Sequence, residues 1–396
     1  MQVALFLEGK KENDGDKLAF ALDALDAADP FSKDVPLPED VLAALSWLSV
    51  LPADTVNYVR EVIITGLEGW AADLRQKGEC SEWFLGCDAA VVKVAEGVNG
   101  PMLRLLAALS GHVDPECIEF FRVGAPLYGL LDRPGIGVPI DCAAVPEAEA
   151  TMREHCLASN AKLLEKLRED PFAKDLMELT RKDAALGRMS EPVPAELSQL
   201  GDVLLVPRFG IEQGLKEDGS VKVRAVDNFS WSPAPEESTA KRSKKTVKGV
   251  CASVRPFLFM VRLRCPVSVG ASINGHCGAQ EKISHDHLDD LARAMAEFID
   301  LIKCVPSLWK ADIDAAFRRV PLKPAHRWAA GVAFRHAGEV WVSCHHAAPF
   351  GATSSVHSWE RVGELICKIA RRMLGLPVFR YVDDYFAPDR CVPTFP

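Results

Sequence analysis

The segment "FRYVDDYFAPD" at residues 379–389 sets the strongest constraint on how this chain of 396 residues can fold. Asp383 and Asp384 are adjacent, and aromatic and β-branched residues that favour strands flank them on both sides. Burying one unpaired carboxylate costs free energy, and burying two that repel each other costs more. We therefore expect a tight hairpin that carries Asp383 and Asp384 at its turn.

Paired carboxylates of this kind are typical of a site for hard divalent cations. Mg²⁺ prefers oxygen ligands, and its charge offsets the repulsion between the acids. A third carboxylate is available at Asp312, which follows the strand-forming run 309–311. Such a set can hold two ions about 3.5–4 Å apart, which stabilise the attacking and leaving oxygens of a phosphoryl transfer. A second Asp-Asp pair, at 289–290, lies in a segment with helical period, where a solvated helix face explains it.

Composition places the chain among globular proteins. It is 48% hydrophobic and 26% charged, as globular domains typically are. No apolar run approaches the roughly 20 residues that span a bilayer. The twelve cysteines include no CxxC pair, which favours free thiols in a reducing compartment over a disulfide framework. We expect an intracellular, soluble protein of the cytoplasm or nucleus with no membrane partner; the sequence does not indicate its oligomeric state.

Charge is distributed unevenly along the chain. Residues 1–200 contain 19 Lys and Arg against 34 Asp and Glu, whereas residues 201–396 contain 27 against 21. An asymmetry of this kind indicates that the second half contacts nucleic acid. The basic run "AKRSKKTVK" (240–248) has two open interpretations, a solvated loop or a strip that binds phosphates.

Hydrophobic periodicity divides the chain near residues 190–200. The segments "PLPEDVLAALSWLSVL" (36–51) and "EDPFAKDLMELTRKDAALG" (169–187) predict helices, the second with Asp170 as N-cap, Pro171 at N1 and Gly187 at its end. From Asp202 onward, "DVLLVPRFGI" predicts a strand and "KEDGSVKVRAVDNFS" a hairpin with a second strand. We predict a mainly helical region over residues 1–195 and a mixed region over residues 196–396.

Several segments of the second half resemble the sequence boxes of reverse transcriptases. "YVDD" (381–384) is similar to their YxDD box, and "KADIDAAFRRVPL" (310–322) resembles the strand with their first catalytic Asp. Between the two, "APFGATSSVHSW" (348–359) is similar to the turn that opens the next palm helix. Upstream, "VKVRAVDNFS" (221–230) resembles the fingers segment that contacts the incoming triphosphate. The resemblance covers roughly residues 200–390, and the boxes occur in the expected order.

The resemblance implies a right-hand polymerase of the α/β (α+β) class, with fingers and an antiparallel palm sheet after a mainly α-helical N-terminal region. Asp312, Asp383 and Asp384 would be the catalytic acids and metal ligands, joined by the backbone of Ile313. The cofactor would be two Mg²⁺ ions, with Mn²⁺ as an alternative. Because only twelve residues follow Asp384, we expect the thumb of such an enzyme to be absent from residues 196–396.

The same resemblance implies five nucleotide-binding residues. Lys222 and Arg224 match the cations that neutralise the β- and γ-phosphates. Phe317 lies where reverse transcriptases place an aromatic steric gate against the 2′-hydroxyl, the group that distinguishes RNA from DNA. Phe350 and Gly351 would line the nucleotide pocket, with glycine allowing close backbone approach.

The implied function is an RNA-directed DNA polymerase of retroelement origin, a transferase that joins deoxynucleoside triphosphates to a primer on an RNA or DNA template. The alternative is a catalytically inactive, truncated remnant that keeps the palm fold and binds nucleic acid. Intact acids at all three positions favour the polymerase, whereas the missing thumb favours the remnant.

Other side-chain clusters have less specific interpretations. Two groups of His and Cys are either zinc ligands or polar loop residues: His276, Cys277, His285 and His287, and Cys344, His345 and His346. Arg318 and Arg319 either contact template phosphates or lie at a solvated strand end.

Overall fold

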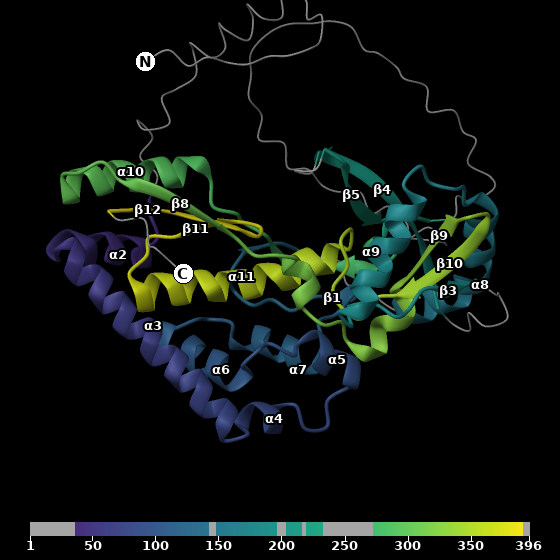
Figure 1. The fold of residues 1–396 in the computed structure, drawn as a ribbon, viewed down its shortest axis with the longest axis horizontal. Helices are drawn as coiled ribbons and strands as arrows, with labels where there is room; N and C mark the ends of the chain where they lie inside the picture. The colour runs from purple at the N-terminus through teal and green to yellow at the C-terminus, as the bar shows by residue number, and fades with distance from the viewer. Residues whose placement is uncertain (1–35, 142–147, 196–202, 216–218, 233–271, 391–396) are drawn as a thin grey trace, which may run out of the picture.

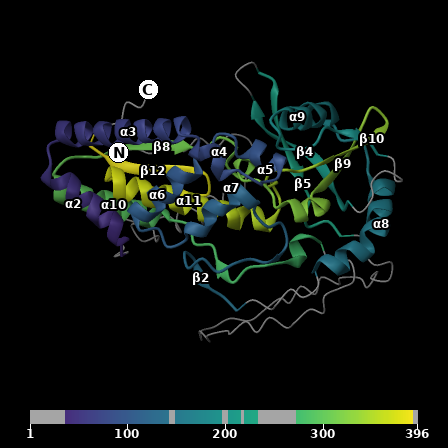
Figure 2. The same cartoon turned by 90° about the horizontal axis from the view of Figure 1, so that it is seen from below.

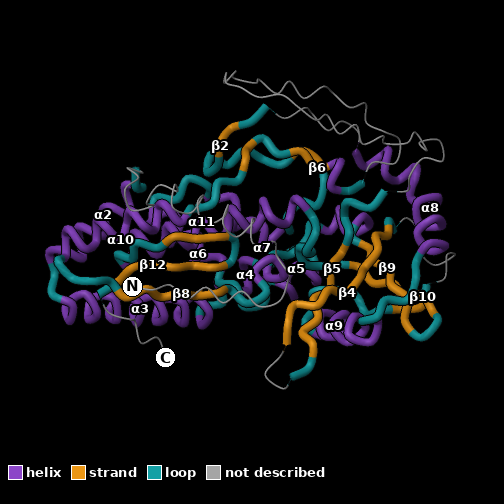
Figure 3. Tube along the Cα trace, turned by 90° about the horizontal axis from the view of Figure 1, so that it is seen from above, coloured by secondary structure: helices purple, strands orange, loops and turns teal. Residues whose placement is uncertain are grey.

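Two separate sheets organise the part of the chain that the computed structural model describes, namely residues 36–141, 148–195, 203–215, 219–232 and 272–390. One has three antiparallel strands in the order β11-β12-β8: β8 (Ser307–Asp312), β11 (Phe379–Tyr381) and β12 (Asp384–Asp389). Figure 3 shows it well apart from the second sheet. The basic run at 240–248 and nearly all of 249–272 lie outside the described residues.

The second sheet has five strands in the order β3-β10-β9-β4-β5. The β4–β5 and β9–β10 pairs are antiparallel hairpins, whereas β4 runs parallel to β9. Figures 1 and 2 show two helices beside this sheet, α8 and α9. The bounds are β3 (Val193–Pro194), β4 (Leu205–Leu215), β5 (Val221–Asp227), β9 (Gly331–His336), β10 (Glu339–Cys344), α8 (Ala148–Lys166) and α9 (Ala173–Ala185).

The long helix α11 (Thr353–Leu374) supports the three-stranded sheet from below in the view of Figure 1. Its Cys367 packs against Tyr385 and Ala387, alternate residues that point to one face of β12. The opposite face is partly covered by α10 (Leu288–Ile302) and α2 (Glu39–Val50), because Phe379 packs with Phe298 and Leu45. The sheet therefore packs one face against α11, whereas its other face is only partly covered by α10 and α2.

The helices formed by residues 53–123 lie below α11 in Figure 1 and close the core on that side. One cluster of buried side chains joins Trp83 and Phe121 to Val332 and Trp359, so residues on both sides of position 195 share a core.

The remaining elements are α3 (Ala53–Gln76), α4 (Glu79–Trp83), α5 (Ala89–Val94), α6 (Gly100–Ser110), η2 (Pro115–Glu119), α7 (Phe120–Val123), β1 (Gly129–Leu130), β2 (Val138–Pro139), η4 (Asn274–His276), β6 (Cys277–Gly278), β7 (Glu281–Lys282), η5 (Ala316–Arg319) and η6 (Pro324–Ala329).

The local predictions from periodicity agree with the structure in kind. The helix expected within 36–51 is α2, the strands expected from residue 202 onward are β4 and β5, and the described residues mix helix and sheet as predicted. One boundary is wrong: α9 begins at Ala173 with Phe172 as N-cap, so Asp170 is not the cap. Instead, the Asp170 carboxylate accepts a hydrogen bond from the Phe172 amide at 2.8 Å and forms a turn before the helix. Among the described helices, none combines the length and the apolar character needed to cross a bilayer.

A buried ion pair gives a test of how strongly the first half is integrated. Arg60 of α3 is paired with Asp389 of β12 and donates to the carbonyls of Leu374 and Gly375 beyond α11. Arg60→Ala leaves Asp389 buried without its partner, so we expect the free energy of unfolding to fall by about 3–5 kcal/mol in urea titrations. Lys77→Ala breaks only an exposed helical pair with Asp73 and should cost less than about 1 kcal/mol. Equal losses in the two variants would show that the Arg60 contacts do not hold the halves together.

Candidate active site

The three predicted acids meet at one end of the three-stranded sheet. In the β12–β8 register, Asp384 lies directly opposite Asp312, although about 70 positions separate them in the sequence. Val382 and Asp383 form the turn between β11 and β12, and the Asp383 carbonyl accepts a hydrogen bond from the Ile313 amide at 3.2 Å. The turn is thus displaced by one residue from the predicted one, because Asp384 already pairs as the first residue of β12.

The acids do not lie in the core, which resolves the problem that their burial would pose. Asp312 is exposed, and Asp383 and Asp384 are half-buried. Asp312 and Asp384 lie on the strand face opposite Tyr385, which packs against α11, so they project from the more open face of the sheet. Tyr385 and Ala387 of β12 are buried, while the three carboxylates remain accessible to a ligand.

A lysine already occupies part of this anionic site. The Lys310 ammonium lies 2.9 Å from Oδ1 of Asp384. This hydrogen bond, with the charges of Asp384, Asp312 and Asp383, raises the pKa of Lys310. Within the described residues, the oxygens of the three acids are not all within 4.8 Å of one another. The negative charge of the three acids attracts a cation. The three carboxylates must move closer together before they can all bind the same ion.

The turn that carries Asp383 has a strained backbone. Val382 has φ of 59°, and a β-branched residue rarely adopts this left-handed conformation. Its carbonyl oxygen accepts two hydrogen bonds, from Trp359 Nε1 at 2.9 Å and from the Arg380 guanidinium at 2.8 Å. Arg380 is itself paired with the buried Glu360 at 2.6 Å. Side chains of α11 therefore fix the conformation of the turn.

Four of the predicted nucleotide-binding residues lie close to one another: Arg224, Phe317, Phe350 and Gly351. The Arg224 guanidinium lies 5.4 Å from the ring centroid of Phe350, and the Phe317 ring meets Phe350 edge-on at 5.2 Å. Gly351 follows Phe350, and a Cβ at this position would lie 2.0 Å from the carbonyl oxygen of Asp227. Close backbone approach does require glycine there, but the group it approaches in this structure is Asp227. Lys222 is exposed on the same face of β5 as Arg224, two residues away.

Arg224 and Phe350 line a cavity of about 390 Å³ beside the end of β8. Ala315 and Asp314, which follow Asp312 closely, form part of its wall. Five cationic side chains line it against three carboxylates, which gives it an excess of positive charge: Lys182, Arg188, Arg208, Arg224 and Arg318 against Asp183, Asp227 and Asp314. A cavity of this size and charge suits a phosphate-bearing ligand.

A buried polar network forms the floor of this cavity, and sequence analysis did not find it. Arg318 donates to Nδ1 of His345 at 2.7 Å, and Nε2 of His345 lies 2.9 Å from the Asp227 carboxylate. Burial pushes the pKa of Asp227 up, but the charge of Arg208 and the hydrogen bond from His345 outweigh it and keep the pKa low. Burial, with Arg318, lowers the pKa of His345 to about 4. The histidine is therefore neutral at neutral pH, accepts from Arg318 and donates to Asp227.

This network corrects the prediction for Arg318. It is buried and paired with Asp183 at 3.0 Å, so it does not lie at a solvated strand end. Its neighbour Arg319 is exposed and lies 3.7 Å from the Asp314 carboxylate. Adjacent residues of this short helical turn take opposite environments, and their order in the sequence carries no signal for which one is buried.

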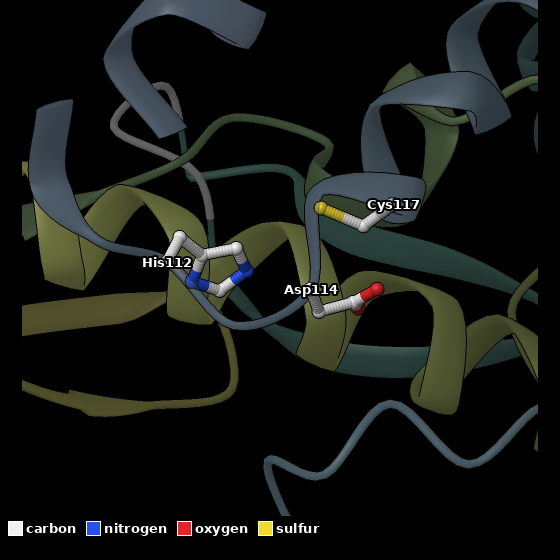
Figure 4. A group of neighbouring side chains, drawn as sticks. All are labelled: His112, Asp114 and Cys117. Carbon is white, nitrogen blue, oxygen red and sulfur yellow. The ribbon is translucent and has the colours of Figure 1, made fainter. Parts of the chain in front are cut away.

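Neither of the two zinc clusters predicted from the sequence brings three ligand atoms close together among the described residues. One other group in this part of the chain does so, with three potential ligand atoms within 4.8 Å of one another. In the predicted clusters, Nδ1 of His276 lies 3.0 Å from the Ser272 carbonyl, and His345 belongs to the buried network. The group that does assemble consists of His112, Asp114 and Cys117, all buried (Figure 4). The spacing H-x-D-x-x-C in "GHVDPEC" (111–117) is the sequence signal that could have found it.

Comparison with known proteins assigns no family. The chain matches no protein-family model. No curated protein is significantly similar to it.

The buried histidine predicts how stability depends on pH. Because the pKa of His345 is lower in the folded chain than the value of about 6.5 for an exposed histidine, the unfolded chain binds the proton first. The contribution of neutral His345 to the free energy of unfolding is therefore complete above pH 6.5 and is lost as the pH falls toward 4. We expect His345→Gln to reduce the loss of unfolding free energy between pH 7 and pH 4.5 by roughly 2 kcal/mol, measured by urea denaturation at each pH.

The control for this experiment is His336→Gln, which changes a half-buried histidine of β9. It should leave the pH dependence close to that of the unaltered chain. If His345→Gln has no larger effect than His336→Gln, then His345 is not the group that couples folding to pH.

Proposed function

We propose that this chain is a template-directed DNA polymerase of the reverse transcriptase type, with fingers and palm in residues 196–396. The observation that carries the proposal is the pairing of Asp312 opposite Asp384, with Asp383 in the adjoining strained turn. Accessible carboxylates on neighbouring strands suit two-metal nucleotidyl transfer. The antiparallel three-stranded sheet would be the palm, and the β4–β5 hairpin would belong to the fingers.

The residues at the site fit two Mg²⁺ ions in donor type and in charge. All three side chains offer carboxylate oxygens, the ligands that Mg²⁺ prefers, and the Lys310 ammonium on Asp384 shows that a cation is attracted there. When bound, the ions would lower the pKa of the primer 3′-hydroxyl and neutralise the leaving pyrophosphate. Asp312, Asp383 and Asp384 would hold them, and movement of Lys310 would free Asp384.

The neighbouring cavity, which Arg224 and Phe350 line, would hold the nucleoside triphosphate. Arg224 and Lys222, on one face of β5, would bind the phosphates. Phe350 would form part of the wall, and Phe317, edge-on to it, would limit the space beside the sugar. The strained turn at Val382, tied to Trp359, would keep Asp383 in position while the substrate is bound.

The first test removes the metal ligands. Asp312→Asn and Asp383→Asn should each lower primer extension with Mg²⁺ by about 10³-fold or more, since metal ions contribute several kcal/mol to such transition states. Asp300→Asn is the control, because Asp300 is an exposed acid of α10 that pairs with Lys303 and is not among the residues that line the cavity. It should retain most of the activity. Extension by Asp383→Asn at the unaltered rate would mean that the activity comes from a contaminant and that the two-metal site is wrong.

The second test concerns the sugar of the nucleotide. The unaltered chain should strongly prefer deoxynucleotides, because the Phe317 ring excludes a 2′-hydroxyl. Phe317→Val should admit ribonucleotides while Asp312 and its neighbours stay in place. The measurement is primer extension with each nucleotide type, comparing kcat/KM for the two sugars in both proteins. Equal use of both sugars by the unaltered chain would show that Phe317, which is buried against Phe350 and Trp359, acts only as a core residue.

A further inference from the structure

The loop after α6 gathers three different metal-binding side chains away from the acidic site. His112 follows Gly111, which ends α6 with a left-handed φ of 66°. Asp114 precedes η2, and Cys117 lies within it. The tight reversal of the chain brings the imidazole, carboxylate and thiol together, so that one potential ligand atom from each lies within 4.8 Å of the other two (Figure 4).

The cluster is buried, and one of its ligand atoms has no partner. Cys117 is 0% exposed, Asp114 1% and His112 8%. Nε2 of His112 is buried without a hydrogen-bond partner, although leaving a buried polar atom unpaired typically costs about 1–3 kcal/mol. A ring nitrogen of a neutral imidazole can donate its lone pair to a metal ion. A metal ion would satisfy this atom.

The surroundings orient the carboxylate of Asp114. Arg361 of α11 donates to both of its oxygens, at 2.6 Å and 2.8 Å. Each carboxylate oxygen has two lone pairs, so this fork leaves one on each oxygen for a metal. Hydrogen bonds of this kind to a ligating carboxylate are typical of metal sites. The guanidinium also lies 4.6 Å from the Phe120 ring centroid, which fixes it in turn.

We propose that His112, Asp114 and Cys117 form a zinc site that fixes the conformation of the loop between α6 and η2. Imidazole, thiolate and carboxylate are the three donor types that zinc takes in proteins, whereas Mg²⁺ prefers oxygen ligands alone. Three protein ligands leave the fourth tetrahedral position for a water molecule. Binding transfers the thiol proton of Cys117 to solvent, so one Zn²⁺ enters and one proton leaves. The charges of Zn²⁺, the thiolate and the carboxylate then sum to zero, and Arg361 keeps its charge.

The proposal concerns a site distinct from the acidic residues at the end of β8, and its test does not depend on polymerase activity. The full-length protein is stripped of metal with a chelator under reducing conditions and titrated with Co²⁺, which reports thiolate ligation by a charge-transfer absorption band. One equivalent should give this band, and Zn²⁺ should abolish it whereas Mg²⁺ should not. Zn²⁺ should also raise the unfolding temperature of the stripped protein.

Variants identify the ligands. His112→Ala and Cys117→Ser should each weaken Co²⁺ binding by more than about a hundredfold, since even changes behind the ligands cost about 10–100-fold. Cys367→Ser is the matched control, because Cys367 is another fully buried thiol and lies on α11. It should keep the band, and so should Asp383→Asn. Circular dichroism of each stripped variant checks that it is folded.

Three outcomes would overturn the zinc site. One is the absence of a charge-transfer band in the unaltered protein. The second is a band that survives in folded His112→Ala and Cys117→Ser. The third is loss of the band in folded Cys367→Ser, which would assign the signal to a different thiol. A loss of primer extension in Asp383→Asn with the band intact would separate the two sites.

Discussion

The carbonyl oxygen of Val382 is the point through which the core controls the acidic site. Val382 adopts a positive φ of 59°, a conformation that costs of order 1–3 kcal/mol and persists only when its surroundings impose it. Trp359 and Arg380 impose it by donating to that oxygen. Arg380 is in turn paired with Glu360. Its guanidinium fits beside α11 only because residue 363 is glycine, since a Cβ there would lie 2.9 Å from the guanidinium. Helix α11 thus determines the conformation of the turn and the position of Asp383.

A second set of buried contacts fixes the wall of the cavity that Arg224 and Phe350 line. The backbone of Gly351 packs so closely on Asp227 that no side chain fits. Asp227 is fixed by His345 and Arg208, and His345 by Arg318. Because each group is buried and has its partner, removing one leaves the others unsatisfied. The position of Phe350, next to Gly351, therefore depends on a network that spans several strands and α9.

Some of these features could be predicted from the sequence, and the distinction is physical. The strand–turn–strand geometry around Asp383 follows from local propensity, although the turn lies one residue earlier than predicted. The proximity of Asp312 follows from its place at the end of a second strand. The Arg318 guanidinium is positioned by its ion pair with Asp183, which is distant in the sequence. The same is true of Gly351, whose partner Asp227 belongs to another strand, and of the Asp114–Arg361 pair. Local patterns carry no information about partners that only the folded chain brings together.

The uneven charge of the two halves has a partly internal explanation. Acids of the first half are paired with bases of α11: Asp114 with Arg361, and Asp40 with Lys368 at 2.9 Å and with Arg371 at 3.6 Å. Both carboxylates are buried, so this charge stabilises the packing of the helices and is not offered to a partner. Removing either member of such a buried pair leaves the other charge uncompensated, so the two segments depend on each other. Under the proposed function, nucleic acid would instead contact exposed bases, such as Lys222 and Arg224 on β5.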